Sequence, residues 1–282
     1  MIADKDTDFV YFSDLLRTDS RYSMTCIEIS KILTINGIKH DFLPVTNDIW
    51  ARDFMPIQIS DDKFVEFRYD PDYLQGSDKG LRNLKTYPDI VFDAIGRKAK
   101  KSNIILDGGN VVKSNNCVIL TDKIIDENRY NYSKTDLIKT LHKLFEVDKV
   151  VIIPKDSHKD DHYGHADGMI RFIDNETVLI NSHFRYLPGL METLQRSQLK
   201  FEFLKYDLKK QNGRNWCYLN YLQTKDIILI PKLNIEEDEL ALQQLKEYFP
   251  EYSQKSSIIQ IELEKVVKRG GALNCISWTI KY

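Results

Sequence analysis

Alternating hydrophobic and polar positions mark four pairs of short segments separated by turn signals, and each pair predicts a β-hairpin. The pairs are residues 55–60 with 64–69, 110–113 with 117–120, 168–173 with 177–180, and 216–222 with 227–230. Residues 272–282 supply a last strand, which we expect to pair with a segment near the N-terminus.

The second, third and fourth hairpins are each followed by apolar residues at helical spacing. These are Leu137, Leu141, Leu144 and Phe145, then Leu190, Leu194 and Leu199, then Leu240, Leu245 and Phe249. Short apolar strands at 150–153, 201–204 and 258–261 come next. A hairpin-helix-strand unit that recurs roughly every fifty residues cannot bury its own sheet face, so it predicts an α/β ring of about five such units around one axis.

No linker rich in proline, glycine or serine interrupts the series, so we expect one domain over residues 1–282. The 42% hydrophobic content is ample for a large core. Forty basic and 42 acidic residues are interspersed and give a formal net charge of −2, which favours neither nucleic acid nor a membrane surface as a partner. The first residues do not predict a secretory signal, no apolar run is long enough to span a bilayer, and the four cysteines are scattered without close pairing. We therefore expect a cytoplasmic protein.

The chemically distinctive residues precede or begin the predicted hairpins, at equivalent places in the repeat. They lie in residues 50–53, 107–110, 164–167, 214–215 and 270–275. In a ring with approximate symmetry, equivalent positions converge on the axis, so these five segments are expected to form one polar pocket.

Within these segments, three motifs differ in how much they indicate. If Gly164 opens a strand, His165 and Asp167 lie on the same face and can share a ligand. Trp50 and Asp53 offer an aromatic face and a carboxylate, which together suit a flat cation. Residues 107–110 read Asp-Gly-Gly-Asn, which on its own is typical of a turn with a structural role.

Cys275 differs from the other three cysteines. Cys26, Cys117 and Cys217 lie in apolar segments and are expected to be small buried hydrophobic residues. Cys275 follows a Gly-Gly pair and is expected on the polar face of a strand, with Ser277 and Thr279. Ile276, Trp278 and Ile280 would lie on the other face. A polar-face thiol entering a site lined by histidine and carboxylates has the surroundings that favour a thiolate.

A metal site is the competing interpretation, because residues 158–167 contain three histidines and three aspartates. Their spacing matches none of the usual zinc motifs, and the segment also reads as a solvated loop. We therefore expect no metal and favour the thiolate.

Taken together, Trp50-x-Arg-Asp53-x-x-Pro56, Asp107-Gly-Gly-Asn110, Gly164-His-x-Asp167 with Arg171-Phe172, and Gly270-Gly-x-x-x-Cys275 resemble the agmatine deiminase and bacterial-type peptidylarginine deiminase family. The matches run in order from about residue 47 to the C-terminal end. The resemblance implies a pentein fold, a five-bladed ring of ββαβ units, which agrees with the repeat.

The resemblance also implies roles for single residues. Cys275 would be the nucleophile, His165 the general acid and base, and Asp53 and Asp167 the carboxylates that hold a guanidinium. Substrate-binding positions would be Trp50, Arg52, Asp107, Asn110 and Asn220. Hydrolysis through a covalent thiouronium would then yield a ureido product and ammonia without any metal or organic cofactor. Either the imidazolium of His165 or the substrate cation would have to activate the thiol.

The chain also departs from the family. Agmatine deiminases usually have histidine before the nucleophile, glutamines shortly after it, and glutamate at the position of Asp107. Here Asn274 precedes Cys275, and Trp278 follows it. Agmatine, arginine and arginyl peptides all stay open as substrates, with Arg52, Arg171 and Arg185 as candidates to bind a substrate carboxylate. Amidino transfer, a guanidinium-binding protein without activity and a homodimeric assembly are left open as well.

Overall fold

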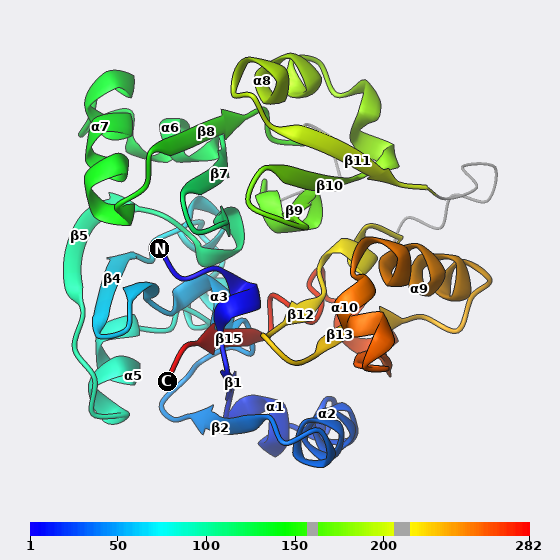
Figure 1. The fold of residues 1–282 in the computed structure, drawn as a ribbon. Coiled ribbons are helices and arrows are strands. Elements are labelled where there is room, and N and C mark those ends of the chain that lie inside the picture. The colour runs from blue at the N-terminus through cyan, green and yellow to red at the C-terminus, as the bar shows by residue number, and fades with distance from the viewer. Residues whose placement is uncertain (157–162, 206–214) are drawn as a thin grey trace.

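The computed structural model describes residues 1–156, 163–205 and 215–282, and within them fifteen strands form five three-stranded sheets. Figure 1 shows the sheets arranged around a common centre. In every sheet the middle strand pairs antiparallel with one neighbour and parallel with the other, and helices connect the parallel pair. This is the ββαβ unit that the sequence repeat predicts.

The elements are given sheet by sheet. The first sheet contains β1 (Phe9–Ser13), β2 (Lys39–Leu43) and β15 (Ser277–Ile280), with α1 (Leu15–Thr18) and α2 (Ser23–Ile35). The second contains β3 (Ile57–Ser60), β4 (Lys63–Arg68) and β5 (Lys100–Ile105), with α4 (Lys79–Arg82) and α5 (Pro88–Ala94). The third contains β6 (Val112–Lys113), β7 (Cys117–Thr121) and β8 (Lys149–Ile153), with α6 (Lys123–Asn128) and α7 (Lys134–Phe145).

The fourth sheet contains β9 (Ile170–Phe172), β10 (Thr177–Asn181) and β11 (Lys200–Leu204), with α8 (Leu190–Arg196). The fifth contains β12 (Leu222–Gln223), β13 (Ile228–Lys232) and β14 (Ile258–Glu262), with α9 (Glu237–Tyr248) and α10 (Pro250–Gln254). Between the sheets lie α3 (Ala51–Phe54) and α11 (Glu264–Val267). Short 3₁₀ turns are η1 (Asp4–Asp6), η2 (Asp72–Leu74), η3 (Gly108–Asn110), η4 (Ala166–Gly168), η5 (Ser182–Tyr186) and η7 (Asn215–Leu219).

The structure confirms the predicted last strand and corrects three details. β15 pairs with β1, so that Phe9 lies opposite Ile280. The segment predicted as a strand from residue 216 begins instead with η7, and only Leu222–Gln223 is strand. Leu240, predicted as a core residue of α9, is 41% exposed. Trp278 and Ile280 share a core cluster, whereas Ile276 precedes β15 and packs in another.

The centre of the ring is polar, and the N-terminal segment occupies it (Figure 1). The carboxylate of Asp4 lies 2.8 Å from the ammonium of Lys113 on β6 and 3.1 Å from the guanidinium of Arg171 on β9. A third cation, Arg52 of α3, is 3.6 Å away. All three cations are buried, so Asp4 offsets part of a concentration of positive charge that would be costly without it.

Candidate active site

The connections that lead into β3, β6, β9, β12 and β15, one in each sheet, bring the sequence-selected residues together. Asp53 lies on α3, Asp107 precedes η3, His165 precedes η4, Asp167 lies in η4, and Asn220 follows η7. Cys275 lies just before β15. Contacts of α3 with η3, of η3 with η4, of η4 with η7 and of α3 with β15 join these segments. The predicted convergence is therefore present for residues 50–53, 107–110, 164–167 and 270–275, and the fourth predicted segment, residues 214–215, is represented by η7, which begins at Asn215.

The two glycines after Asp107 allow this close approach. A Cβ at Gly108 would lie 1.9 Å from the carbonyl oxygen of Arg52, and a Cβ at Gly109 would lie 2.5 Å from Nδ1 of His165. The backbone N–H of Gly109 donates to Oδ1 of Asp53 at 3.0 Å. The structural role expected for the Gly-Gly pair is confirmed, and it consists of packing between the site segments.

His165 lies between two carboxylates. Its Nε2 donates to Oδ2 of Asp107 at 3.0 Å, and its Nδ1 lies 3.8 Å from Oδ1 of Asp53. Burial lowers the pKa of His165, but Asp53 and the hydrogen bond to Asp107 outweigh it and raise the pKa to about 9. At neutral pH the imidazole is therefore protonated and can act as a proton donor.

Asp53 has the opposite preference. Burial raises its pKa to about 7, with further raising by Asp107 and Asp167, although His165 lowers it. Asp107 keeps a lowered pKa in spite of its burial, because Lys123 and His165 both stabilise its charge. The site thus contains two different carboxylates. Asp107, which is bonded to Nε2 of His165, is ionised, whereas Asp53, near Nδ1, is a carboxylate that a cation would help to ionise.

Cys275 is enclosed by amide and carboxylate groups. Its thiol lies 3.2 Å from Oδ1 of Asn220 and 3.6 Å from Oδ2 of Asp167, as a donor to both. Asn274 donates from its side chain to the same oxygen of Asp167 at 2.7 Å, and the backbone N–H of Cys275 donates to Oδ1 of Asn220. Asn274 therefore positions the carboxylate beside the sulfur.

The electrostatics around this thiol correct one expectation. Burial, Asp167 and Asp53 together raise the pKa of Cys275 well above its ordinary value. The carboxylates that would hold a guanidinium thus oppose a thiolate while no cation is bound. The prediction of surroundings that make a thiolate is wrong for the protein without substrate.

The local conformation of the site also differs from the strand that was predicted. Asp167 is in the 3₁₀ turn η4 with His165 as its N-cap residue, and Cys275 precedes β15. His165 and Asp167 therefore do not share a strand face, and Cys275 is not on one. The segments meet because tight turns, not strands, carry the polar residues.

Two residues predicted to bind substrate have hydrogen-bond partners within the protein. The Arg52 side chain is 4% exposed, and it faces Asp4 and donates to the carbonyl oxygen of Asn274. Asn110 accepts the backbone N–H of Thr121 through Oδ1 at 2.9 Å. Arg52 and Asn110 thus have partners within the protein, and Asp107 contacts the imidazole; the contribution of all three to substrate binding stays a prediction.

The remaining candidates are placed as follows. Trp50 lies against Gly271, where an added Cβ would come within 2.1 Å of the indole ring. Arg171 pairs with Asp4 and donates to the carbonyl oxygen of Tyr221 at 3.1 Å. The guanidinium of Arg185 lies over the ring of Phe203.

Lys123 and Tyr73 are site residues that the sequence did not suggest. Lys123 donates to Oδ2 of Asp107 at 2.6 Å, and the hydroxyl of Tyr73 lies 3.5 Å from the same oxygen. No local pattern marks either residue, because both reach the site from connections inside the second and third sheets.

Most of the competing metal site falls on residues 157–162, which lie outside the described residues. Arg214 also lies outside them. Within residues 1–156, 163–205 and 215–282 no group of three histidine, cysteine or acidic side chains is placed to hold a metal ion. Over the same ranges, no helix has the length and apolar character needed to cross a membrane.

The chain is similar to known proteins in both sequence and structure. A protein of Lactococcus lactis provisionally named as an agmatine deiminase is 22% identical, over 82% of this chain and 74% of its own length. The structure of C. jejuni agmatine deiminase superposes with a TM-score of 0.76 at 17% identity, covering 100% of this chain and 95% of that one. A Cys-to-Ser variant of that enzyme with substrate bound gives 0.74 at 17% identity, over 100% and 96%.

These superpositions confirm the pentein fold, the five-bladed ring expected from the repeat. The family model for Porphyromonas-type peptidyl-arginine deiminase matches residues 25–280, nearly the whole chain. The chain belongs to the Porphyromonas-type peptidyl-arginine deiminase family.

Proposed function

We propose that this chain is a cysteine-dependent hydrolase that converts a guanidinium group to a ureido group and ammonia. One observation carries the proposal: Cys275, Asp167, Asp53 and His165, from three separate segments of the chain, meet in one buried site. A guanidinium is flat, cationic and rich in N–H donors, and two carboxylates and an aromatic ring are the groups that hold such a cation.

Asp53 and Asp167 would bind the nitrogens of the guanidinium. Asp53 lies beside Nδ1 of His165, and Asp167 lies beside the sulfur of Cys275. A cation held between them has its central carbon next to the thiol and one nitrogen next to the imidazole. Such orientation supplies much of the acceleration in a reaction of this type.

The substrate itself would activate the thiol. In the free protein the pKa of Cys275 is raised by burial and by two neighbouring carboxylates. A bound guanidinium neutralises those carboxylates and places positive charge beside the sulfur, which favours the thiolate. Of the two activators considered from sequence, this arrangement supports the substrate cation, since His165 is bonded to Asp107.

The reaction then needs one proton donor that later becomes a base. The thiolate of Cys275 adds to the guanidinium carbon, His165 gives its proton to the leaving nitrogen, and ammonia departs. A covalent thiouronium remains. The neutral imidazole next removes a proton from water, and the hydroxide adds to the carbon. The C–S bond then breaks while the proton of the added hydroxyl passes to solvent, which releases the ureido product and the thiolate.

The identity of the substrate's tail is a narrower proposal. Binding of a tail carboxylate would require a free cation, but Arg52 and Arg171 are both engaged with Asp4, and the guanidinium of Arg185 lies over the ring of Phe203. We therefore favour an amine such as agmatine over free arginine or an arginyl peptide. Since all four cysteines are unpaired, we also propose that the protein works in the reducing cytoplasm.

The test is release of ammonia and ureido product from agmatine, arginine, arginyl peptides and methylated guanidines. Cys275→Ala should abolish release, while Cys26→Ala, which removes another buried thiol, should retain it. EDTA should have no effect. Undiminished release by Cys275→Ala would refute the proposal. Transfer of the amidino group to an added amine, in place of hydrolysis, would establish the amidinotransferase alternative.

A further inference from the structure

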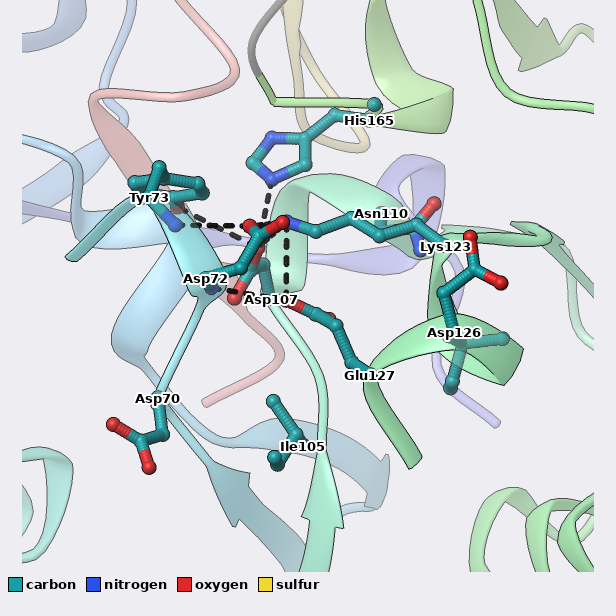
Figure 2. A network of polar contacts seen from close by, with 12 residues as sticks. Asp70, Asp72, Tyr73, Ile105, Asp107, Asn110, Lys123, Asp126, Glu127 and His165 are labelled. Atoms are coloured by element: carbon teal, nitrogen blue, oxygen red, sulfur yellow. Dashed lines mark hydrogen bonds and ion pairs between the residues drawn. The ribbon is translucent and has the colours of Figure 1, made fainter. Parts of the chain in front are cut away.

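A lysine lies directly behind the carboxylate that holds the imidazole. Figure 2 shows Asp107 between His165 and Lys123, and the same oxygen, Oδ2, accepts from Nε2 of His165 at 3.0 Å and from Nζ of Lys123 at 2.6 Å. The other oxygen of Asp107 is buried and has no hydrogen-bond partner among the described residues. Both of the carboxylate's strong contacts therefore compete for one atom.

Lys123 is itself held firmly. Its side chain is 5% exposed, and its ammonium lies 3.6 Å from Glu127 on the same helix, 3.9 Å from Asp72 on η2, and 4.7 Å from the centre of the Tyr73 ring. Asp107 is the nearest of the acidic groups. Burial lowers the pKa of Lys123, but Asp107 and Glu127 outweigh it and the pKa is raised, so the lysine is charged.

We propose that Lys123 is a positioning residue, whose ammonium fixes the carboxylate of Asp107 and limits how firmly that carboxylate retains the proton of His165. The inference rests on the proposed function, in which His165 must first give a proton to the leaving nitrogen and then accept one from water. Asp107 alone would orient the imidazole but would also make it a reluctant donor. Lys123 lets Asp107 keep the imidazole oriented while it weakens the hold of Asp107 on the imidazole proton.

The charges around His165 give the direction of the effect. Asp53 from α3 and Asp107 raise its pKa, Lys123 from α6 lowers it, and the rings of Tyr73 and Tyr163 pack against it without charge. Around Lys123 the facing groups are Asp107, Glu127, Asp72 and the ring of Tyr73. Removing the ammonium therefore leaves the imidazolium with its two carboxylates and without its repelling cation, which makes it a weaker acid.

The experiment compares Lys123→Met with Lys155→Met. Lys155 also pairs with a carboxylate of α6, at 2.7 Å from Asp126, but it is 42% exposed and does not contact Asp107. Titration of the His165 ring followed by NMR, assigned with His165→Asn, should show a raised pKa in Lys123→Met alone. The alkaline limb of the kcat profile should move to higher pH in the same variant. At neutral pH kcat should fall about tenfold, a part of the ~10²–10⁴ that a positioned acid and base contributes.

Removing a buried cation can destabilise the fold, so a second variant is included. Lys123→Met combined with Glu127→Gln removes one acidic partner together with the cation and still leaves Asp107 without its lysine. If the first variant does not fold, the same titration is read from the second. An unchanged or lowered His165 pKa in whichever variant folds would overturn the proposal.

The two proposals can fail separately. The NMR titration needs no substrate, so a protein that releases no ammonia from any guanidine still reports whether Lys123 controls the proton on His165. In that case a raised His165 pKa in Lys123→Met would support the positioning role although the proposed hydrolysis was refuted. If the enzyme is active but Lys123→Met changes neither the His165 titration nor the pH profile, the proposed hydrolase stands and the positioning role of Lys123 is refuted.

Discussion

Replacing Asp4 with asparagine tests whether the N-terminal segment stabilises the ring by its charge. Asp4 faces Lys113, Arg171 and Arg52, and all three cations are buried. Asparagine keeps the shape of the side chain and removes only the charge. Breaking a buried ion pair on one side typically costs about 3–5 kcal/mol, because the remaining charge stays buried without its partner.

The assay is equilibrium unfolding in urea, with thermal unfolding as a second measurement. At 2–4 °C for each kcal/mol in a chain of this size, the melting temperature should fall by about 6–20 °C. Asp6→Asn is the matched control, since Asp6 belongs to the same 3₁₀ turn and accepts one exposed hydrogen bond from Asn115. Its loss should cost about 1 kcal/mol or less.

The pH dependence of the difference adds a sign. Although burial raises the pKa of Asp4, Lys113, Arg52 and Arg171 outweigh it and hold the pKa well below its usual range. Its contribution is therefore complete above the pKa of the unfolded chain, near 3.9, and shrinks as the pH falls below that value. A loss under about 1 kcal/mol at pH 7, or a gap between wild type and Asp4→Asn that stays constant down to pH 3, would refute the reasoning.

Three further predictions concern the site. The pKa of Asp53 is raised to about 7. Guanidinium binding to Cys275→Ala protein, measured by calorimetry, should therefore weaken as the pH falls through 7. If the same pH dependence persisted after Asp53→Asn, it would contradict the assignment of Asp53 as a guanidinium-binding carboxylate. A guanidinium that binds without being turned over should increase the ultraviolet absorbance of thiolate in wild type and not in Cys275→Ala. No increase would argue against activation by the substrate. Gly271→Ala should displace the indole of Trp50 and weaken guanidinium binding by up to about 2 kcal/mol, whereas Gly76→Ala, which meets no atom within 4 Å, should leave it unchanged.

The sequence carried the repeat and the principal site residues because both have local signatures. Hairpin alternation and apolar strands mark most of the sheets, and cysteine, histidine and aspartate beside glycine mark the turns between them. Helix α2 went unrecognised because Met24, Ile27 and Ile35 are exposed on it, which obscures the apolar stripe expected of an amphipathic helix.

What the sequence could not provide is the direction of each side chain after the ring has closed. Arg52 is next to Asp53 in the chain, yet its guanidinium faces Asp4, whereas the Asp53 carboxylate faces His165. Lys123 reads as an ordinary solvated residue at the start of a helix. Its burial against Asp107 depends on how two sheets pack, and no spacing within one segment reports that.

The pairing of β15 with β1 has a consequence for how the protein folds. One sheet joins strands from opposite ends of the described chain. The strand that completes this sheet, β15, directly follows the turn that bears Cys275. Contacts between residues so distant in sequence form slowly, because the loop they close carries a large entropic cost. During synthesis the second to fifth sheets can therefore assemble while Cys275 is still apart from Asp53 and Asp167. Chemical competence would then appear only at the final step of ring closure.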